Sequence, residues 1–215
     1  MMTNKDLRSF REEYTMHSLD ESSVPPDPLV LFDRWLGEAI SSKLPEPNAM
    51  TLATVTPEGK PSARVLLLKE VDQGRFIFYT NYESDKGKEL LHQPHGALVF
   101  LWLELQRQVR VSGPVSRLDA ATSDAYFALR PRPSQVGAIV SPQSRIIGSR
   151  EELEKAFEKR WNDAGDQVIK RPAHWGGFAL VPGRIEFWQG RESRLHDRIL
   201  YTNIGKEWQI SRLAP

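Results

Sequence analysis

A series of short β-type segments, which begins near Met50 and is divided by turn residues, constrains the fold of this chain more than any other feature. The first turns, at residues 56–61 and 72–74, contain glycine and separate apolar segments. Many short strands with helices around them favour a closed or split barrel, so we expect a mainly β fold with peripheral helices. The predicted strands are residues 50–55, 62–69, 75–80, 97–103, 108–115, 176–180, 184–189, 198–201 and 208–213.

Helical periodicity is strongest in residues 28–43, where the apolar side chains form one broad stripe and Asp27 can cap the N-terminus. Ser84 is the expected N-cap of a shorter helix that follows the third strand. The predicted helices are residues 28–43, 84–91, 119–129 and 149–163.

The first 26 residues differ from the rest of the chain. Residues 4–14 have a mixed, helix-forming composition, and the proline-rich segment 21–28 that follows interrupts any regular element. We therefore interpret residues 1–26 as a mobile arm. The remaining residues, 27–215, fit the size of a single domain.

Composition limits the partners and the location of the protein. The formal net charge is +1, so no global field favours nucleic acid or an acidic membrane. The chain has no cysteine, which excludes disulfides and a thiolate nucleophile, and its five histidines show no metal-ligand spacing. Residues 1–14 are charged throughout, without the apolar region of a signal peptide. We expect a cytoplasmic protein with no metal, nucleic-acid or membrane partner.

Two cationic segments are candidates for an anion site. Residues 64–69 (Arg-Val-Leu-Leu-Leu-Lys) form an apolar strand with a cation at each end, although solvated charges at strand ends are the alternative. Residues 79–88 place Tyr79, Thr80 and several lysines at a strand-to-helix junction. Free amides at a helix N-terminus can hold a phosphate there. An ordinary capped surface helix explains the same pattern.

Two further segments supply hydrogen-bonding groups. In residues 108–112 the polar and apolar residues alternate, so that Gln108, Arg110 and Ser112 share one face of a strand. That face could meet the polar edge of a heterocycle or simply solvent. Residues 142–145 add amide and hydroxyl donors, with ordinary loop chemistry as the alternative.

Residues 126–135 combine Tyr126, Arg130, Arg132 and Ser134 where prolines stop a helix and stiffen the chain. A second phosphate could bind among these groups. Solvated arginines on a loop are the alternative, and Arg132 could pair with an acidic side chain instead.

The densest polar segment is residues 186–198, in which Trp188 precedes a turn and then an alternation of cations with His196. This pattern predicts a ligand-facing strand. In the alternative, Trp188 lies in the core and Asp197 pairs with a nearby arginine. A histidine titrates near neutral pH, so His196 could orient a substrate or handle a proton.

Taken together, these segments resemble the pyridoxine 5'-phosphate oxidase family over almost the whole chain. The resemblance implies an FMN-binding split β-barrel and a homodimer with active sites at the interface. The motifs that carry it are residues 64–69, 78–81 (Phe-Tyr-Thr-Asn), 107–110 (Arg-Gln-Val-Arg), 130–135 (Arg-Pro-Arg-Pro-Ser-Gln), 185–190 (Ile-Glu-Phe-Trp-Gln-Gly), 194–198 (Arg-Leu-His-Asp-Arg) and the terminal 212–215 (Arg-Leu-Ala-Pro).

The resemblance also implies roles for single residues. Arg194 and His196 would be catalytic, beside the pyridine ring of the substrate. The implied FMN contacts are Arg64, Val65, Leu66, Leu67, Leu68, Lys69, Tyr79, Thr80, Lys86, Gln108, Gln143, Ser144, Trp188 and Arg198. The implied substrate contacts are Arg11 and Tyr14 of an N-terminal lid, together with Lys69, Tyr126, Arg130, Ser134, Arg194, Leu195 and His196.

Two positions depart from the family pattern. Asp85 stands where many relatives carry a basic residue, which predicts weaker retention of FMN. Glu12 replaces a common arginine of the lid, so Arg11 and Tyr14 are the safer assignments there.

The family chemistry implied by the resemblance is oxidation of pyridoxamine or pyridoxine 5'-phosphate to pyridoxal 5'-phosphate, with O2 reduced to hydrogen peroxide. Another split-barrel flavoenzyme would share the FMN segments but would not need Tyr126, Arg130 and Ser134. A catalytically silent flavin-binding or pyridoxal-phosphate-binding protein is the alternative from a different class. Sequence leaves open the preference between amine and alcohol, the FMN affinity and the existence of a secondary pyridoxal-phosphate site.

Overall fold

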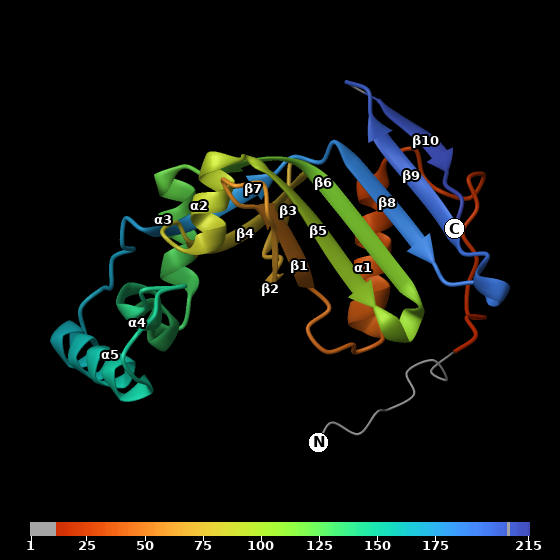
Figure 1. Ribbon diagram of the computed structural model, residues 1–215. Helices are drawn as coiled ribbons and strands as arrows, with labels where there is room; N and C mark the ends of the chain where they lie inside the picture. Colours follow the sequence, from red (N-terminus) through yellow and green to blue (C-terminus); the bar gives the residue numbers. More distant parts are fainter. Residues whose placement is uncertain (1–11, 206) are drawn as a thin grey trace, which may run out of the picture. The chain divides into compact units, whose positions relative to one another are not determined.

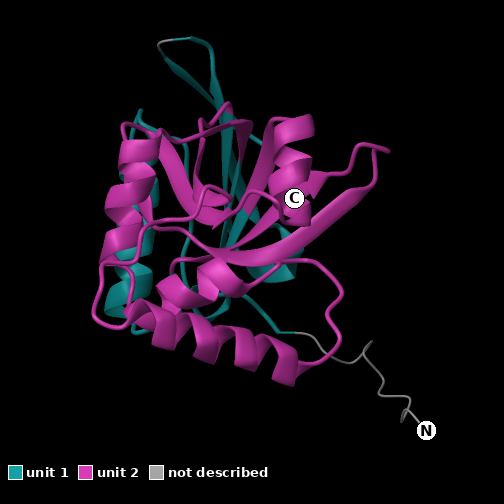
Figure 2. Cartoon of the chain, turned by 90° about the vertical axis from the view of Figure 1, so that its left-hand side faces the viewer, with its two compact units in different colours: residues 1–47, 99–111, 184–215 teal, residues 48–98, 112–183 magenta. Residues whose placement is uncertain are grey.

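The computed structural model describes residues 12–205 and 207–215. No helix in these ranges is long and apolar enough to cross a membrane. Figure 2 shows that the chain forms two compact units. The interpretation of residues 27–215 as one domain, and of 1–26 as an arm, stays a prediction. Unit 1 combines the described part of Met1–Pro47 with Val99–Val111 and Arg184–Pro215, and unit 2 combines Asn48–Leu98 with Ser112–Gly183.

The helix of unit 1, α1 (Pro28–Ser41), begins where the sequence predicts. The Asp27 carboxylate accepts a hydrogen bond from the Leu29 N–H at 2.9 Å, which satisfies one of the free amides of the first turn. The apolar stripe is buried, and the ring of Trp35 packs edge-on against that of Phe187 at 5.2 Å between centroids. Burial of this stripe, rather than helix propensity, is what stabilises a helix of this length.

The sheet of unit 1 has the strand order β10, β9, β8, β6, β5. Strands β8 and β9 pair antiparallel, with Trp188 opposite Arg198. Strands β9 and β10 also pair antiparallel, with Arg212 opposite Ile199. Figure 1 shows the course of β5 and β6, and the boundary between the two units falls inside each of these strands. The bounds are β5 (His95–Trp102), β6 (Arg107–Arg117), β8 (Arg184–Gln189), β9 (Asp197–Asn203) and β10 (Trp208–Arg212), with 3-10 turns η2 (Leu103–Leu105) and η3 (Glu192–Arg194).

In unit 2, β1 pairs antiparallel with β2, and β4 pairs antiparallel with both β3 and β7. Helices α3, α4 and α5 contribute to a small apolar core that includes Phe127, Val136 and Trp175. The bounds are β1 (Ala49–Val55), β2 (Pro61–Leu67), β3 (Glu70–Asp72), β4 (Arg75–Asn81), α2 (Asp85–His92), α3 (Ala120–Leu129), α4 (Arg132–Val140), α5 (Arg150–Ala164) and β7 (Trp175–Leu180).

The expected mainly β fold with peripheral helices is confirmed, but three local predictions need correction. Helix α4 occupies a segment that we took to be a proline-stiffened stretch. Pro133 lies in its first turn, where a missing N–H breaks no helical hydrogen bond. The strand predicted for residues 62–69 ends earlier, because β2 ends at Leu67, and the short strand β3, which begins at Glu70, was not predicted.

The third correction concerns residues 186–198, where we expected a continuous ligand-facing strand after the turn. Residues Glu192–Arg194 form a 3-10 turn, and β9 begins only at Asp197. Ser193 and Arg194 have φ values of 54° and 60°, so the chain reverses through the left-handed region instead of running extended. His196 therefore lies in a connection that precedes the strand.

Candidate active site

Unit 2 contains a cavity of about 540 Å³ that gathers many of the predicted site residues. The side chains come from β2, β4, α3, α4 and the segments beside them. Ten of its lining residues were assigned from the family resemblance, whereas Leu129, Pro131 and Trp175 were not. The assigned ones are Val65, Leu66, Leu67, Lys69, Tyr79, Thr80, Tyr126, Arg130, Ser134 and Gln143.

Three stacked aromatic rings form one wall of this cavity. The rings of Tyr79 and Tyr126 are nearly parallel, with centroids 3.8 Å apart, and the ring of Trp175 lies 5.5 Å from that of Tyr79. Burial raises the pKa of Tyr79 to about 12 and also raises the pKa of Tyr126, so both hydroxyls keep their protons at neutral pH. The wall offers flat apolar faces with two hydroxyl donors.

Arg130 gives the same cavity a cation with unused hydrogen-bonding capacity. Its guanidinium lies 4.5 Å from the centre of the Trp175 ring, and its Nη1 is buried without a hydrogen-bond partner among the described residues. Burial lowers the pKa of Arg130, although arginine remains charged at physiological pH. Ser134 lies in the first turn of α4, close along the chain. A buried donor without a partner is costly, so this group is suited to an anionic ligand.

A second cation, Lys86, lies in the first turn of α2. Its side chain is buried, and its Nζ donates to Ser84 Oγ at 3.2 Å and to Gln143 Oε1 at 3.1 Å. Thr80 Oγ1 donates to the same Gln143 oxygen at 3.2 Å. Burial lowers the pKa of Lys86, and the charge of Arg64 lowers it further. No carboxylate in the described ranges forms an ion pair with Lys86, which leaves this ammonium group suited to a phosphate.

Arg64 was expected at the same phosphate, but its side chain does not line the cavity. Its Nη2 forms an ion pair with Glu89 at 3.0 Å and donates to Ser62 Oγ at 2.5 Å. Its Nη1 donates to Thr54 Oγ1 and to the Leu52 carbonyl oxygen. Thr54 also donates to the buried Glu89 carboxylate. Sequence reasoning missed Glu89 because a helical glutamate gives no sign of a partner 25 residues away.

Besides Arg64 and Lys86, two other assigned residues of unit 2, Leu68 and Ser144, lie outside the cavity lining. Leu68 is buried, with its N–H bonded to the Asn48 carbonyl at 2.9 Å. Ser144 is exposed and has a positive φ of 69°. Asp85, which departs from the family pattern, is exposed, whereas the next residue, Lys86, is buried. The Asp85 carboxylate therefore faces solvent.

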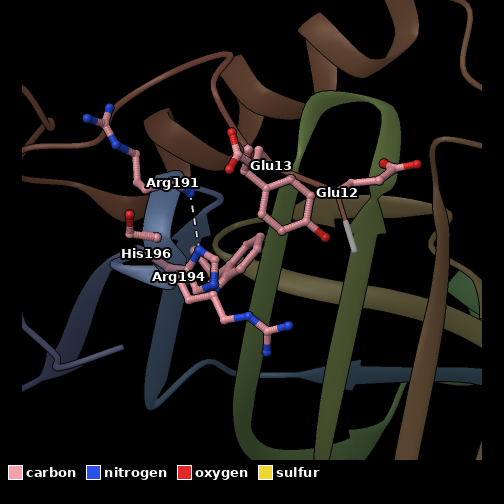
Figure 3. Close-up of a pocket in the computed structure, with 8 residues that line it drawn as sticks. Glu12, Glu13, Arg191, Arg194 and His196 are labelled. Atoms are coloured by element: carbon pink, nitrogen blue, oxygen red, sulfur yellow. Dashed lines mark hydrogen bonds between the residues drawn. The ribbon is translucent and has the colours of Figure 1, made fainter. Parts of the chain in front are cut away.

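Unit 1 contains a second cavity, of about 460 Å³, shown in Figure 3. It gathers four residues assigned from the resemblance, namely Tyr14, Trp188, Arg194 and His196. Arg11 lies outside the described residues. The lining also includes four residues that sequence reasoning did not select for a site: Glu12, Glu13, Arg191 and Ser193.

The imidazole of His196 is oriented by the backbone. Its Nδ1 accepts a hydrogen bond from the Arg191 N–H at 3.1 Å, which places the proton of the neutral ring on Nε2 (Figure 3). Burial lowers the pKa of His196, and the neighbouring Arg194 lowers it further. The ring lies 4.6 Å from the ring of Trp188. His196 is therefore a neutral Nε2–H donor at physiological pH.

Three assigned residues of unit 1 do not line this cavity. Arg198 forms an ion pair with Glu186 at 2.9 Å, and Arg110 pairs with the same carboxylate at 3.3 Å. Leu195 is 70% exposed, and Gln108 is partly buried on β6. No group of three or more acidic or histidine side chains in the described residues is arranged to hold a metal ion.

Comparison with protein families finds two matches. Residues 36–162 match the family described as pyridoxamine 5'-phosphate oxidase. Residues 175–215 match the pyridoxine 5'-phosphate oxidase C-terminal dimerisation region.

Curated relatives cover the full chain. The pyridoxine/pyridoxamine 5'-phosphate oxidase of Nostoc sp. (strain PCC 7120) is 51% identical over 99% of this chain and 100% of the relative. The protein of the same name from Burkholderia vietnamiensis (strain G4) is 54% identical over 97% of this chain and 99% of the relative.

Solved structures extend the likeness to the fold. PhzG from Burkholderia lata 383, solved in complex with tetrahydrophenazine-1-carboxylic acid, is similar with a TM-score of 0.85 and 30% identity over 90% of this chain and 95% of that protein. An FMN-binding protein related to pyridoxamine 5'-phosphate oxidase, from Nostoc punctiforme PCC 73102, has a TM-score of 0.71 and 18% identity over 89% and 98% of the two chains. It supports the fold alone.

The fold is thus the split β-barrel of FMN-binding proteins, as the sequence predicted. More specifically, the chain belongs to the pyridoxamine 5'-phosphate oxidase family, which makes it an oxidoreductase.

Proposed function

We propose that this protein uses FMN to oxidise pyridoxamine 5'-phosphate and pyridoxine 5'-phosphate to pyridoxal 5'-phosphate, with O2 reduced to hydrogen peroxide. The observation that carries the proposal is the unit 2 cavity, in which stacked aromatic rings lie beside a buried, unpartnered Arg130 donor. A phosphorylated aromatic ring matches both features. The names of the relatives agree with this substrate class.

The residues around Lys86 fit the phosphate of FMN. Among the described residues, the buried Lys86 ammonium group has only neutral hydrogen-bond partners, Ser84 and Gln143. Thr80 would add a hydroxyl donor if it no longer donated to Gln143. A dianionic phosphate would compensate this charge through short, charge-assisted hydrogen bonds. Arg64 would raise the local positive potential from its network with Glu89.

The phosphate and ring of the substrate would bind at the aromatic wall. Arg130 and Ser134 would donate to the phosphate, and Lys69 would add positive charge. The rings of Tyr79 and Tyr126 would hold the pyridine ring by stacking and exclude water from it.

FMN, when bound, would supply the two-electron redox chemistry in which the C4' carbon of the substrate is oxidised and O2 is reduced to hydrogen peroxide. The chain supplies orientation for this step. Arg194 would orient the substrate through its guanidinium donors, and His196 would donate its Nε2–H to the ring substituents. With the amine substrate, water then releases ammonia from the oxidised product.

We further propose a cytoplasmic homodimer whose active sites lie at the subunit interface. The match to a dimerisation region supports the dimer. Because the matched residues 175–215 include Trp188, Arg194 and His196, it also supports active sites at the interface. Sedimentation of the purified protein at micromolar concentration should give twice the mass of 24.6 kDa. A monomeric protein that retains full activity would contradict an interfacial site.

The function is tested by incubating the purified protein with FMN and pyridoxamine 5'-phosphate in air. We expect aldehyde and hydrogen peroxide to form in equal amounts, and an Arg194→Ala variant to lose turnover far more than FMN binding. Bound FMN without aldehyde would instead favour another split-barrel flavoenzyme or a silent binding protein.

A further inference from the structure

The chain segment that carries Tyr14 is tied to the C-terminal strand through Arg212. The Arg212 guanidinium donates two hydrogen bonds to the Glu21 carboxylate, from Nε to Oε1 at 2.6 Å and from Nη2 to Oε2 at 2.5 Å. Its Nη1 donates to Asp197 Oδ1 at 2.8 Å, and Nη2 also donates to the Leu19 carbonyl oxygen at 3.2 Å. One side chain thus links β10, β9 and the N-terminal segment.

Asp197 and Arg191 also contact the N-terminal segment, at Leu19 and His17. The second Asp197 carboxylate oxygen accepts the Leu19 N–H at 3.0 Å, and Leu19 is buried. Arg191 donates from Nη1 to the His17 carbonyl oxygen at 3.1 Å and lies 3.6 Å from Asp197. Residues 17–21 are therefore held by three charged side chains of unit 1, and neither Asp197 nor Arg212 lines either of the two cavities described above.

The held segment places Tyr14 on the unit 1 cavity. The Tyr14 ring lies 5.8 Å from the ring of Trp188, edge-on, and 5.8 Å from that of His196. It also packs directly on Gly190, where an added Cβ would meet Tyr14 Cγ at 2.7 Å and Tyr14 Cβ at 2.8 Å. Only a glycine at position 190 leaves room for the ring.

We propose that Arg212 and Asp197 are positioning residues that latch residues 17–21 to the β9–β10 hairpin and thereby hold Tyr14 against the unit 1 cavity. The effect on turnover rests on the function proposed above, whereas the latch itself does not.

The geometry distinguishes this latch from an ordinary surface ion pair. Single exposed pairs contribute little, but bidentate arginine–carboxylate contacts that belong to a network contribute more. Asp197 is 17% exposed, while Arg212 and Glu21 are 38% and 40% exposed, so salt should weaken the latch without abolishing it. The hydrogen bonds from Ser22 and Arg212 lower the pKa values of Asp20 and Glu21 respectively, so the latch stays charged at neutral pH.

The direct test is chymotrypsin cleavage after Tyr14 in the full-length, FMN-loaded protein, followed by mass spectrometry. We expect Arg212→Gln to speed this cleavage by about five- to tenfold, in line with the loss of a networked pair. Arg212→Lys keeps the charge without the bidentate contact, so its cleavage rate should lie between those of the unaltered protein and of Arg212→Gln. Arg150→Gln, which removes an exposed pair on α5, is the matched control and should change nothing.

Steady-state kinetics provide the second readout. Arg212→Gln should raise the KM for pyridoxamine 5'-phosphate while FMN affinity and kcat change little, because Arg212 contacts no residue of either cavity wall except through Asp197 and the arm. Gly190→Ala should raise KM in the same way by displacing the Tyr14 ring, without touching any ion pair.

The outcomes separate the two proposals. Faster cleavage in a protein without oxidase activity would support the latch and overturn the proposed function. Unchanged cleavage and unchanged KM in a folded Arg212→Gln protein would overturn the latch. If that variant fails to fold, unchanged cleavage and KM in Gly190→Ala would overturn it instead.

Discussion

At the scale of single residues, Lys86 combines burial with the absence of an ion-pair partner among the described residues. Burial and Arg64 lower its pKa from 10.5, so the ammonium group loses its proton at a lower pH than an ordinary lysine does. FMN affinity should therefore fall as the pH rises through this lowered pKa. Titrating FMN binding by flavin fluorescence between neutral and alkaline pH measures the effect.

Lys86→Gln should weaken FMN binding about tenfold to hundredfold, the usual value of one charge-assisted hydrogen bond, and should remove this alkaline dependence. Lys88→Gln is the matched control, because Lys88 is exposed on the same helix. An unaltered pH profile in Lys86→Gln would show that another group binds the phosphate.

Substitution of Arg130 should weaken the binding of substrate but not the binding of FMN. Arg130→Lys retains a charge but loses the planar donor pair, so the KM for pyridoxamine 5'-phosphate should rise about tenfold to hundredfold. FMN affinity should stay the same, because none of the contacts of Lys86 involves Arg130. Equal losses of FMN and substrate affinity would mean that Arg130 serves the cofactor or the fold.

Glu89 should matter mainly for stability. Its carboxylate is buried and holds both Arg64 and Thr54, so Glu89→Gln leaves the Arg64 guanidinium without its counter-charge. Breaking a pair that is still one-fifth exposed on the arginine side should lower the free energy of unfolding by about 2–3 kcal/mol, measured by urea denaturation. Glu154→Gln, which breaks an exposed pair on α5, should cost less than about 0.5 kcal/mol.

Residue types in the sequence predicted which groups the unit 2 cavity gathers, but not how they are paired. Tyr126, Arg130 and Ser134 lie within nine residues of one another at the end of a helix, so local sequence suffices to bring them together. Glu89 reaches its partners only through packing of α2 against β1, and Trp175 reaches Tyr79 only through the pairing of β7 with β4. That pairing is a property of the folded sheet and leaves no local signal.

At the scale of secondary structure, period-2 patterns and turn residues were enough to find the strands, but not the point where one strand changes partners. The Leu68 N–H bonds to Asn48, beside β1, whereas the Lys69 N–H bonds to Ile77 in β4. The chain thus changes from one neighbour to another between Leu68 and Lys69, at the end of the apolar residues 65–68. A pattern of side chains cannot reveal this change, because it occurs in backbone pairing.

The turn η3 stores conformational strain beside the catalytic candidates. Ser193 has a φ of 54°, which a residue with a Cβ adopts at a cost of about 1 kcal/mol. Ser193→Gly should therefore raise the free energy of unfolding by about 0.5–1 kcal/mol, and Ser193→Val should lower it, both measured by urea denaturation. The half-buried Ser141, whose φ is −78°, gives the control substitution Ser141→Gly, which should not stabilise the protein. Equal effects of the two glycines would contradict strain at Ser193.

At the scale of the whole molecule, the assigned groups separate into two sets, one in each unit. Unit 2 holds Lys86, Arg130 and the aromatic wall, which suit two phosphates and a flat ring. Unit 1 holds Arg194 and the oriented His196. The sequence, through its resemblance to a family, predicted both sets and a dimer that would use them. It could not predict the latch at Arg212, because the Glu21 partner of Arg212 lies 191 residues earlier in the chain.

The central claim is that the bound substrate gives its electrons directly to FMN held by this chain. The most direct measurement is the visible spectrum of the FMN-loaded protein under anaerobic conditions during addition of pyridoxamine 5'-phosphate. We predict that the flavin absorbance bleaches in proportion to the pyridoxal 5'-phosphate formed, and that it returns when air is admitted. An oxidised flavin spectrum that persists at saturating substrate would contradict the account.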